Sequence, residues 1–203
     1  MAVRVCMHMT DMTLLVSKAC ARTTDVLAAV KDDQLDGATP CEKLTVRELV
    51  AHVGGLGAAF AAAARKDLGQ LTDSPPGDGG YQLDRDWRSQ YPGNLALLAD
   101  CWRDPGAWNG MTRVGGADLP GEVCGMVALT EVVVHGWDVA VATGQDFEVD
   151  DDVAQAVLAH LASFAADGPV EGLFGPAVEI GSDATVFERA LAFSGRDPRV
   201  RPV

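Results

Sequence analysis

Glu131 and His135 stand four residues apart in ALTEVVVHGWDVAVATG, an otherwise apolar stretch long enough to form a buried helix. Residues at i and i+4 lie one above the other on a single helical face, so both side chains can reach one ion from the same side. A second histidine, His52, lies inside another apolar helical pattern, VRELVAHVGGLGAAF. Histidine and carboxylate donors form catalytic zinc sites, which keep one position for water or substrate. The sequence therefore predicts an open divalent-metal site at His52, Glu131 and His135.

The same three residues also fit two other arrangements. A histidine on an apolar helix is commonly a hydrogen-bonded core residue, and a buried glutamate needs a polar partner of some kind. The alternative to a metal site is therefore a buried hydrogen-bond network. Two histidines and one carboxylate also match the ligands of non-haem Fe(II) enzymes. The donor set alone leaves zinc, nickel and iron open.

Three further residues could take part in the predicted site. Two lie near its ligands in the helical pattern, and the third is another histidine. Asp138 follows His135 by three residues on the adjoining helix face, which predicts a partner that orients an imidazole, or a general base. Its alternative is a hydrogen bond to a neighbouring backbone. Cys124 lies two turns before Glu131 and could approach the ion, although a buried apolar role is favoured for a free cysteine. His160 has no companion at ligand spacing and is predicted to be a packing or surface residue.

Charge and composition restrict the partners of the protein. The chain has 203 residues, of which 48% are apolar, and this suits one domain with a sizeable core. Its formal net charge is −13, and the sixteen lysine and arginine residues are scattered. Nucleic acids and anionic membranes both require clustered basic residues, so neither is an expected partner. The expected partner is a small molecule.

Compartment is indicated by the cysteines and by the apolar runs. The five cysteines include no C-x-x-C pair, which predicts reduced thiols. No apolar run reaches the roughly 18 to 20 uncharged residues of a membrane span, and the N-terminus lacks the apolar core of a signal peptide. These features predict a cytoplasmic protein.

Helical periodicity and punctuation predict an all-α fold. Thr45 and Glu48 form an S/T-x-x-E capping box at the start of the second helix, and Pro92-Gly93 is expected to divide the third. The segment 104–120 is expected to be irregular, with a short hairpin. Helices are predicted over residues 11–32, 45–65, 83–103, 121–143, 150–166 and 184–193.

These elements predict a single domain over residues 1–203. Four main helices form a bundle, a class of fold that holds metals between facing helices. A fifth helix covers the bundle, residues 168–203 form an irregular C-terminal strap with a short helix, and residues 1–10 form a disordered extension. Glycine-rich and alanine-rich helix faces permit close packing between copies, so a homodimer is a further expectation.

Three stretches carry a resemblance to a known family: TPCEKLTVRELVAHVGG, LPGEVCGMVALTEVVVHGWDVAVATGQ and FGPAVEIGSDATVFERALAFSGRDP. They resemble the actinobacterial DinB-like metal-binding proteins related to the N-terminal domain of mycothiol-dependent maleylpyruvate isomerase. The family pattern, a histidine in the second helix and E-x-x-x-H in the fourth, falls on His52, Glu131 and His135. The resemblance implies a DinB-like four-helix bundle that holds a divalent ion, usually zinc.

The resemblance also implies a function. It suggests a metal-dependent thiol transferase or isomerase of mycothiol type, with mycothiol as cosubstrate and a small molecule as substrate. The alternatives are a non-catalytic module that binds a metal or small ligand, and a non-haem iron enzyme. Only about 60 residues follow Gly144, so the chain is expected to be shorter than the full isomerase. Candidates for binding a substrate carboxylate are Arg47, Arg85, Arg88 and Arg113.

Overall fold

The computed structural model describes residues 9–75, 80–165 and 175–200. Within these ranges the chain is almost entirely helical, and its only sheet has two antiparallel strands. The predicted all-α fold is therefore confirmed. The main helices are α1 (Met9–Ala29), α2 (Val46–Arg65), α4 (Trp87–Cys101), α6 (Gly121–Ala142), α7 (Asp151–Ala165) and α8 (Val186–Phe193). The shorter elements are η1 (Asp32–Gln34), α3 (Gln70–Asp73), α5 (Pro105–Trp108), β1 (Met111–Val114) and β2 (Ala117–Pro120).

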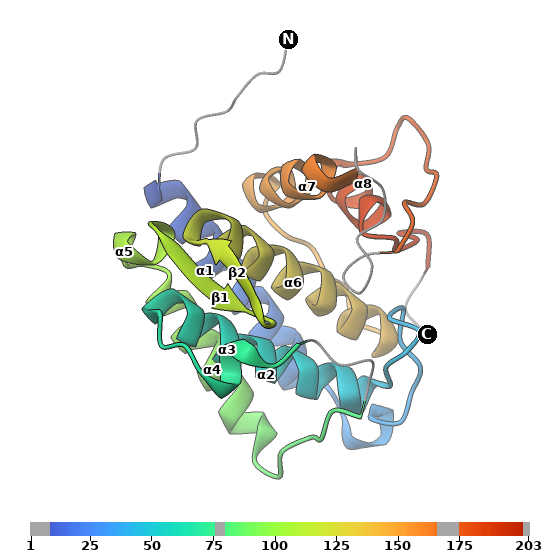
Figure 1. Cartoon of the computed structure of the whole chain (residues 1–203). Helices are drawn as coiled ribbons and strands as arrows, with labels where there is room; N and C mark the ends of the chain where they lie inside the picture. The colour runs from blue at the N-terminus through green and yellow to red at the C-terminus, as the bar shows by residue number, and fades with distance from the viewer. Residues whose placement is uncertain (1–8, 76–79, 166–174, 201–203) are drawn as a thin grey trace.

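Four helices form the bundle, and each packs against two others. Helix α2 contacts α4 and α6, and α1 contacts the same two helices, so the four enclose a common core (Figure 1). The largest fully buried side chains in this core include Trp102, Phe60 and Leu129. The hairpin of β1 and β2 packs against the end of the bundle beside α2 and α6. The hairpin expected within 104–120 is thus confirmed.

Local sequence signals explain where α2 begins and why α4 continues past its proline. The Thr45 side chain accepts a hydrogen bond from the Glu48 backbone amide, and Glu48 accepts one from Thr45, so the predicted capping box is present. The predicted division of the third helix at Pro92 is wrong, because α4 runs through it. The helix begins only at Trp87, and Pro92, its sixth residue, lacks the amide proton that would bond to the Arg88 carbonyl; packing of α4 against α1 and α2 keeps the helix continuous past this point.

Helix α6 is the central element of the core. Its length and composition would allow it to cross a membrane, with a mean hydropathy of 1.4 over its best 18-residue window, but 83% of that window is buried inside the protein. A helix that is apolar around its whole circumference is buried in a core or a bilayer. Here neighbouring helices surround it, and the polar residues buried on it, including Glu131, His135 and Asp138, must find partners within the protein.

The C-terminal part forms a second layer against the bundle. Helices α7 and α8 pack on each other, and α7 also contacts α6 and α1 (Figure 1). The short helix predicted over 184–193 is present as α8, which begins with a second capping box at Thr185 and Glu188. Residues 175–185 have no regular helix or strand. The extension predicted for residues 1–10 falls mostly outside the described residues.

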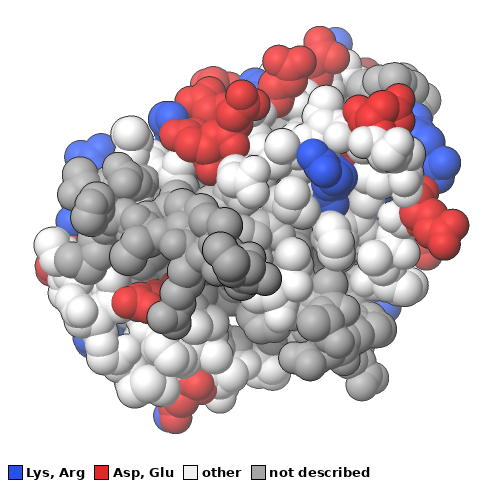
Figure 2. Space-filling view, turned by 90° about the horizontal axis from the view of Figure 1, so that it is seen from above, with Lys and Arg blue, Asp and Glu red and all other residues white. Residues whose placement is uncertain are grey.

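The surface reflects the acidic composition. Figure 2 shows patches of aspartate and glutamate side chains on one face, with lysine and arginine scattered between them. Several basic side chains of the protein are paired with acids, as Lys18 is with Asp150 and Asp152 at 2.8 and 2.7 Å. Such a surface has no continuous basic stripe on the face shown.

Candidate metal centre

Helix α6 presents Glu131 and His135 on one face, as their spacing predicts. The Oε2 atom of Glu131 lies 3.2 Å from Nε2 of His135. Both side chains are nearly enclosed, with 8% and 10% of their side-chain surfaces exposed. A buried carboxylate and a buried imidazole at this distance satisfy each other, which explains how two polar side chains are accommodated within an apolar helix.

His52 reaches the same point from α2. Its Nε2 atom lies 4.0 Å from Oε2 of Glu131, and its ring meets the ring of His135 edge to face, with centroids 4.9 Å apart. The ring of Tyr81 packs on the other side of His52 at 4.8 Å. The segment that carries Tyr81 is tied to α2, because the amide of Gly80 donates a hydrogen bond to the capping-box residue Glu48. Glu48 thus has a structural role, as its sequence position indicates.

The three donor atoms fit a divalent ion. Each of His52, Glu131 and His135 offers a ligand atom, and the three atoms lie within 4.8 Å of one another. Ligands about 2.0 to 2.1 Å from a tetrahedral zinc are separated from each other by about 3.3 Å. The separations of 3.2 and 4.0 Å found here differ from that value by less than 1 Å. Two nitrogens with one carboxylate oxygen suit zinc, nickel or iron.

Asp138 holds His135 in the orientation that a ligand requires. Its Oδ2 atom lies 3.0 Å from Nδ1 of His135, and the carboxylate is completely buried. Arg196 donates to both oxygens of Asp138, from Nε at 3.2 Å and from Nη2 at 2.9 Å. A carboxylate that accepts a hydrogen bond from Nδ1–H keeps the proton on Nδ1 and leaves Nε2 as the atom available to a metal. Of the two roles predicted for Asp138, this geometry favours the orienting one.

Charge is divided unequally between the two histidines. Burial lowers the pKa of His52 to about 4, with a further contribution from the nearby His135. Burial acts in the same direction on His135, but hydrogen bonds to Asp138 and Glu131 outweigh it and raise the pKa of His135 to about 9. In the metal-free protein at neutral pH, His52 is therefore neutral and His135 is an imidazolium. Ligation requires the Nε2 proton of His135 to leave, as metal binding to histidine generally does.

Both carboxylates of the centre stay ionised although they are buried. Burial raises the pKa of Glu131, but the hydrogen bond and charge of His135 more than offset it, so its pKa is lowered. Burial likewise raises the pKa of Asp138, and the charge of Arg196 with the hydrogen bond from His135 brings it below its usual range. Two carboxylates thus face two cationic side chains, which leaves little net charge in the enclosed centre.

The family of the chain is decided by a match along most of the bundle. Residues 16–140 match the family described as the mycothiol maleylpyruvate isomerase N-terminal domain. The chain belongs to this family. The match contains His52, Glu131, His135 and Asp138, whereas Arg196 lies beyond it. The family membership confirms the resemblance seen in the sequence.

Individual relatives and solved structures agree with this assignment. Uncharacterized proteins from two strains of Mycobacterium tuberculosis, CDC 1551 / Oshkosh and ATCC 25618 / H37Rv, are each 29% identical over 139 residues, which are 66% of this chain and 68% of the relative. The crystal structure of a mycothiol-dependent maleylpyruvate isomerase is similar with a TM-score of 0.68 at 16% identity. A histidine-to-alanine variant of such an isomerase gives a TM-score of 0.63 at 17% identity, over 85% of this chain and 78% of that one. At these identities the structures show a shared fold.

The extent of the structural match corrects one expectation. The alignment with the isomerase covers 99% of this chain and 95% of that chain. The expectation that this chain is shorter after its fourth long helix than the isomerase is therefore wrong for the solved isomerase chain, nearly all of which is aligned. The layer of α7 and α8, with the irregular residues around it, lies within the aligned part.

Arg196 is the residue of this family member that the sequence did not reveal. Of the four arginines that were candidates for binding a substrate carboxylate, three form ion pairs on the surface: Arg47 with Asp36, Arg88 with Asp32, and Arg113 with Asp73 and Asp118. The basic side chain in contact with the centre is instead Arg196, which comes 58 residues after Asp138. The only signal in the sequence was the FSGRDP stretch of the family resemblance.

Two cysteines differ in their relation to the centre. Cys124 is fully buried on α6 and belongs to neither group of side chains that could hold an ion, so the apolar role favoured for it is supported. Cys41, from the loop before α2, does belong to a second such group with His135 and Asp138. The Arg196 guanidinium occupies the oxygens of Asp138, and its positive charge opposes a metal at that second position. Burial raises the pKa of the Cys41 thiol, and the negative charge of Asp138 raises it further.

His160 of α7 is buried, and it belongs to neither group of ligand atoms found among the described residues. Burial lowers the pKa of His160 to about 4, while the charge of Glu131 acts weakly in the opposite direction. The unfolded chain has an ordinary histidine pKa of about 6.5. The stabilising effect of neutral His160 is therefore fully present above pH 6.5, and it is lost as the pH falls from 6.5 toward 4, where the unfolded state alone takes up the proton.

Proposed function

We propose that this protein binds one divalent ion, zinc, through His52, Glu131 and His135. With this ion it would act as a thiol transferase or isomerase in the cytoplasm. The observation that supports this most directly is the convergence of the three donor atoms within 4.8 Å, reached from two bundle helices. A hydrogen-bond network alone would account for Glu131 and His135. It does not require a neutral His52 at the same point, with the pKa of that imidazole lowered to about 4.

The thiol part of the proposal is based on the family. A mycothiol-type thiol is the proposed cosubstrate, with a small molecule as substrate, because the family is described by mycothiol and maleylpyruvate isomerase. Zinc lowers the pKa of a bound thiol, so it would supply a thiolate at neutral pH. Asp138 and Arg196 would hold His135 in place, and Tyr81 would limit the movement of the His52 ring and exclude water from one side.

Two alternatives make different predictions. A non-haem iron enzyme shares the ligand set, and it would show iron-dependent oxygen uptake. A non-catalytic module that binds a metal or small ligand would bind the ion but would not bring a thiol to it. The partly enclosed ligand side chains are compatible with both, so chemistry must separate them.

Elemental analysis tests the metal site. Wild-type protein, purified without a metal-binding tag, is expected to contain about one equivalent of zinc, and His52→Ala and Glu131→Ala are expected to contain little of it. Both variants should keep their helical content, because the bundle has a large apolar core and does not need zinc to fold as a zinc finger does. A wild-type protein that contains no metal and takes up no added zinc, nickel or iron would refute the site.

Cobalt substitution tests the thiol. Cobalt(II) at this centre gives visible absorption bands that respond to a change of ligand. Addition of mycothiol is expected to shift these bands and to add sulfur-to-cobalt charge transfer. A spectrum that does not change at saturating mycothiol would eliminate the thiol mechanism while leaving the metal site intact.

A further inference from the structure

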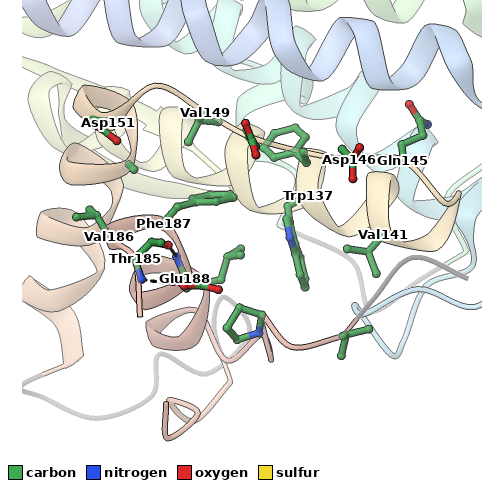
Figure 3. A pocket seen from close by; sticks show the side chains of 16 residues that line it. Trp137, Val141, Gln145, Asp146, Val149, Asp151, Thr185, Val186, Phe187 and Glu188 are labelled. Atoms are coloured by element: carbon green, nitrogen blue, oxygen red, sulfur yellow. Dashed lines mark hydrogen bonds between the residues drawn. The ribbon is translucent and has the colours of Figure 1, made fainter. Parts of the chain in front are cut away.

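A pocket lies on the other side of α6 from the candidate metal centre. This open pocket of about 430 Å³ is lined by the end of α6, the 145–149 connection, the start of α7, helix α8 and residues 198–200. Figure 3 shows the side chains of Trp137, from α6, and Phe187, from α8, on either side of this pocket. A volume of this size is within the range of small-molecule sites, about 300 to 1,000 Å³.

Helix geometry separates this pocket from the metal ligands. Trp137 follows His135 by two residues, which is about 200° around the helix, so the two side chains face opposite sides. Val141, one turn after Trp137, lines the pocket as well, whereas His52, Glu131 and His135 do not. A ligand in this pocket would therefore leave the metal centre free.

The walls of the pocket are aromatic. Trp137 and Phe147 are buried, and Phe187 is half-buried, and all three line the space. The rings of Phe147 and Phe187 lie 6.1 Å apart. Aromatic faces carry negative charge density and attract cations, most strongly where water is partly excluded. This wall suits a ligand with an apolar body and a positive charge.

The rim of the pocket is acidic. Four of its lining residues are carboxylates, Asp146, Glu148, Asp151 and Glu188, and the described lining includes no lysine, arginine or histidine. Arg199 stands between two lining residues but is paired with Asp197 at 2.7 Å. Two other basic side chains line a separate pocket of about 90 Å³ across the 148–149 segment. One of them, Lys18, is already paired with two aspartates, and the other, Arg22, lies over the Phe147 ring and donates to the backbone carbonyl of Asp146.

We propose that this pocket binds a small organic cation, an ammonium group attached to an apolar body of about ten heavy atoms. The aromatic wall and the four rim carboxylates select the same charge, and no lining group competes for the carboxylates as a cation. An anionic ligand of the same size would face four like charges. The proposal concerns a site distinct from the metal centre and is independent of the reaction at that centre.

A quaternary ammonium probe tests the proposal cleanly, because it has no lone pair with which to ligate a metal. Binding of benzyltrimethylammonium to the zinc-loaded full chain would be measured by calorimetry and saturation-transfer NMR. Benzyl alcohol and phenylacetate provide the same ring with no charge and with negative charge. The cation is expected to bind saturably and about tenfold more tightly than the alcohol, from the combined cation–π and rim charge effects. Phenylacetate is expected not to bind.

Charge-neutral variants locate the site. Glu188→Gln and Glu148→Gln are each expected to weaken binding of the cation about threefold. Glutamine at 188 keeps the capping box of α8, so the helix should remain folded, and thermal unfolding would verify it. Glu122→Gln, at the opposite end of α6 and outside the pocket, is the matched control and should have no effect. His52→Ala should bind the cation as wild type does.

The outcomes are decisive in both directions. Preference for the cation, weakened by the two pocket variants and unchanged in the two controls, supports the site. Equal affinity for cation and alcohol, loss of binding in His52→Ala, or insensitivity to Glu188→Gln and Glu148→Gln would overturn it.

Discussion

Replacing Asp138 by asparagine should reduce zinc affinity without removing a ligand. In the wild type, Asp138 accepts a hydrogen bond from His135 Nδ1 at 3.0 Å and two from Arg196. Asparagine has nearly the same shape but only one acceptor oxygen. Either its amide NH₂ group points at the guanidinium, or it points at the imidazole and reverses the tautomer that presents Nε2 to the ion.

The size of the effect follows from the partners that Asp138 serves. Loss of a carboxylate that orients a metal-bound histidine typically lowers metal affinity about 10- to 100-fold, or about 1.4 to 2.7 kcal/mol. The free energy of unfolding of the metal-free protein should fall by more than this loss of zinc-binding energy. The Arg196 side chain is only 10% exposed and would keep its charge without a counter-ion. Breaking a buried ion pair in this way costs about 3 to 5 kcal/mol.

The assay is competition for zinc with a chromogenic chelator at a temperature where all variants are folded. Asp25→Asn, an exposed position on α1, is the matched control and should behave as wild type. Arg196→Gln should also weaken zinc binding, and the double variant with Asp138→Asn should be little worse than Asp138→Asn alone, because Arg196 acts through Asp138. A zinc affinity of Asp138→Asn within twofold of wild type would refute the orienting role.

Three further expectations concern positions outside the ligand set. His160→Leu should leave the zinc content unchanged. Between pH 7 and pH 5, the free energy of unfolding, measured with urea, should fall by about 2 kcal/mol less in this variant than in the wild type, because the variant lacks the histidine whose pKa is lowered by folding. A pH dependence equal to that of the wild type would count against the burial argument. Gly54→Ala should destabilise the protein by about 1 to 3 kcal/mol, since its Cβ would lie 2.3 Å from the Tyr91 ring. Gly55→Ala, at the neighbouring position where a Cβ would meet no other atom, should stabilise α2 by about 0.5 to 1 kcal/mol. Thermal unfolding of both variants measures the difference, and equal stabilities would contradict the packing around Gly54.

The parts of the fold that depend on local rules were predictable from the sequence. The capping box at Thr45 and Glu48 marked the start of α2 to within a residue, because its two hydrogen bonds form between residues three apart. The i, i+4 relation of Glu131 and His135 likewise depends only on helix geometry, and their nitrogen and oxygen meet at 3.2 Å. The predicted proximity of His52 required a further assumption, that the second and fourth long helices face each other.

The parts that were missed depend on tertiary packing. Tyr81 and Arg196 both lie outside regular elements, where no periodicity fixes the direction of a side chain, and Arg196 is 58 residues from its partner. A sequence window cannot show that Arg196, of the sixteen basic residues, is one whose side chain is nearly enclosed. Pro92 was misjudged for a different reason. The break expected there came from the propensity of proline alone, whereas α4 runs from Trp87 through Pro92 and is held by its packing against α1 and α2.

The ion pair between Asp138 and Arg196 has a consequence for how the protein is made. A chain emerges from the ribosome with its N-terminus first, so the four bundle helices, with His52 and His135, emerge before Arg196 does. Until then, Asp138 has only His135 as a partner, and a carboxylate that lacks part of its pairing in an apolar helix favours exposure to water over burial. A nascent or truncated chain that stops before residue 196 would thus hold α6 less firmly and remain visible to proteases. In this protein, the segment that carries Arg196 emerges after the four bundle helices and completes the centre that they form.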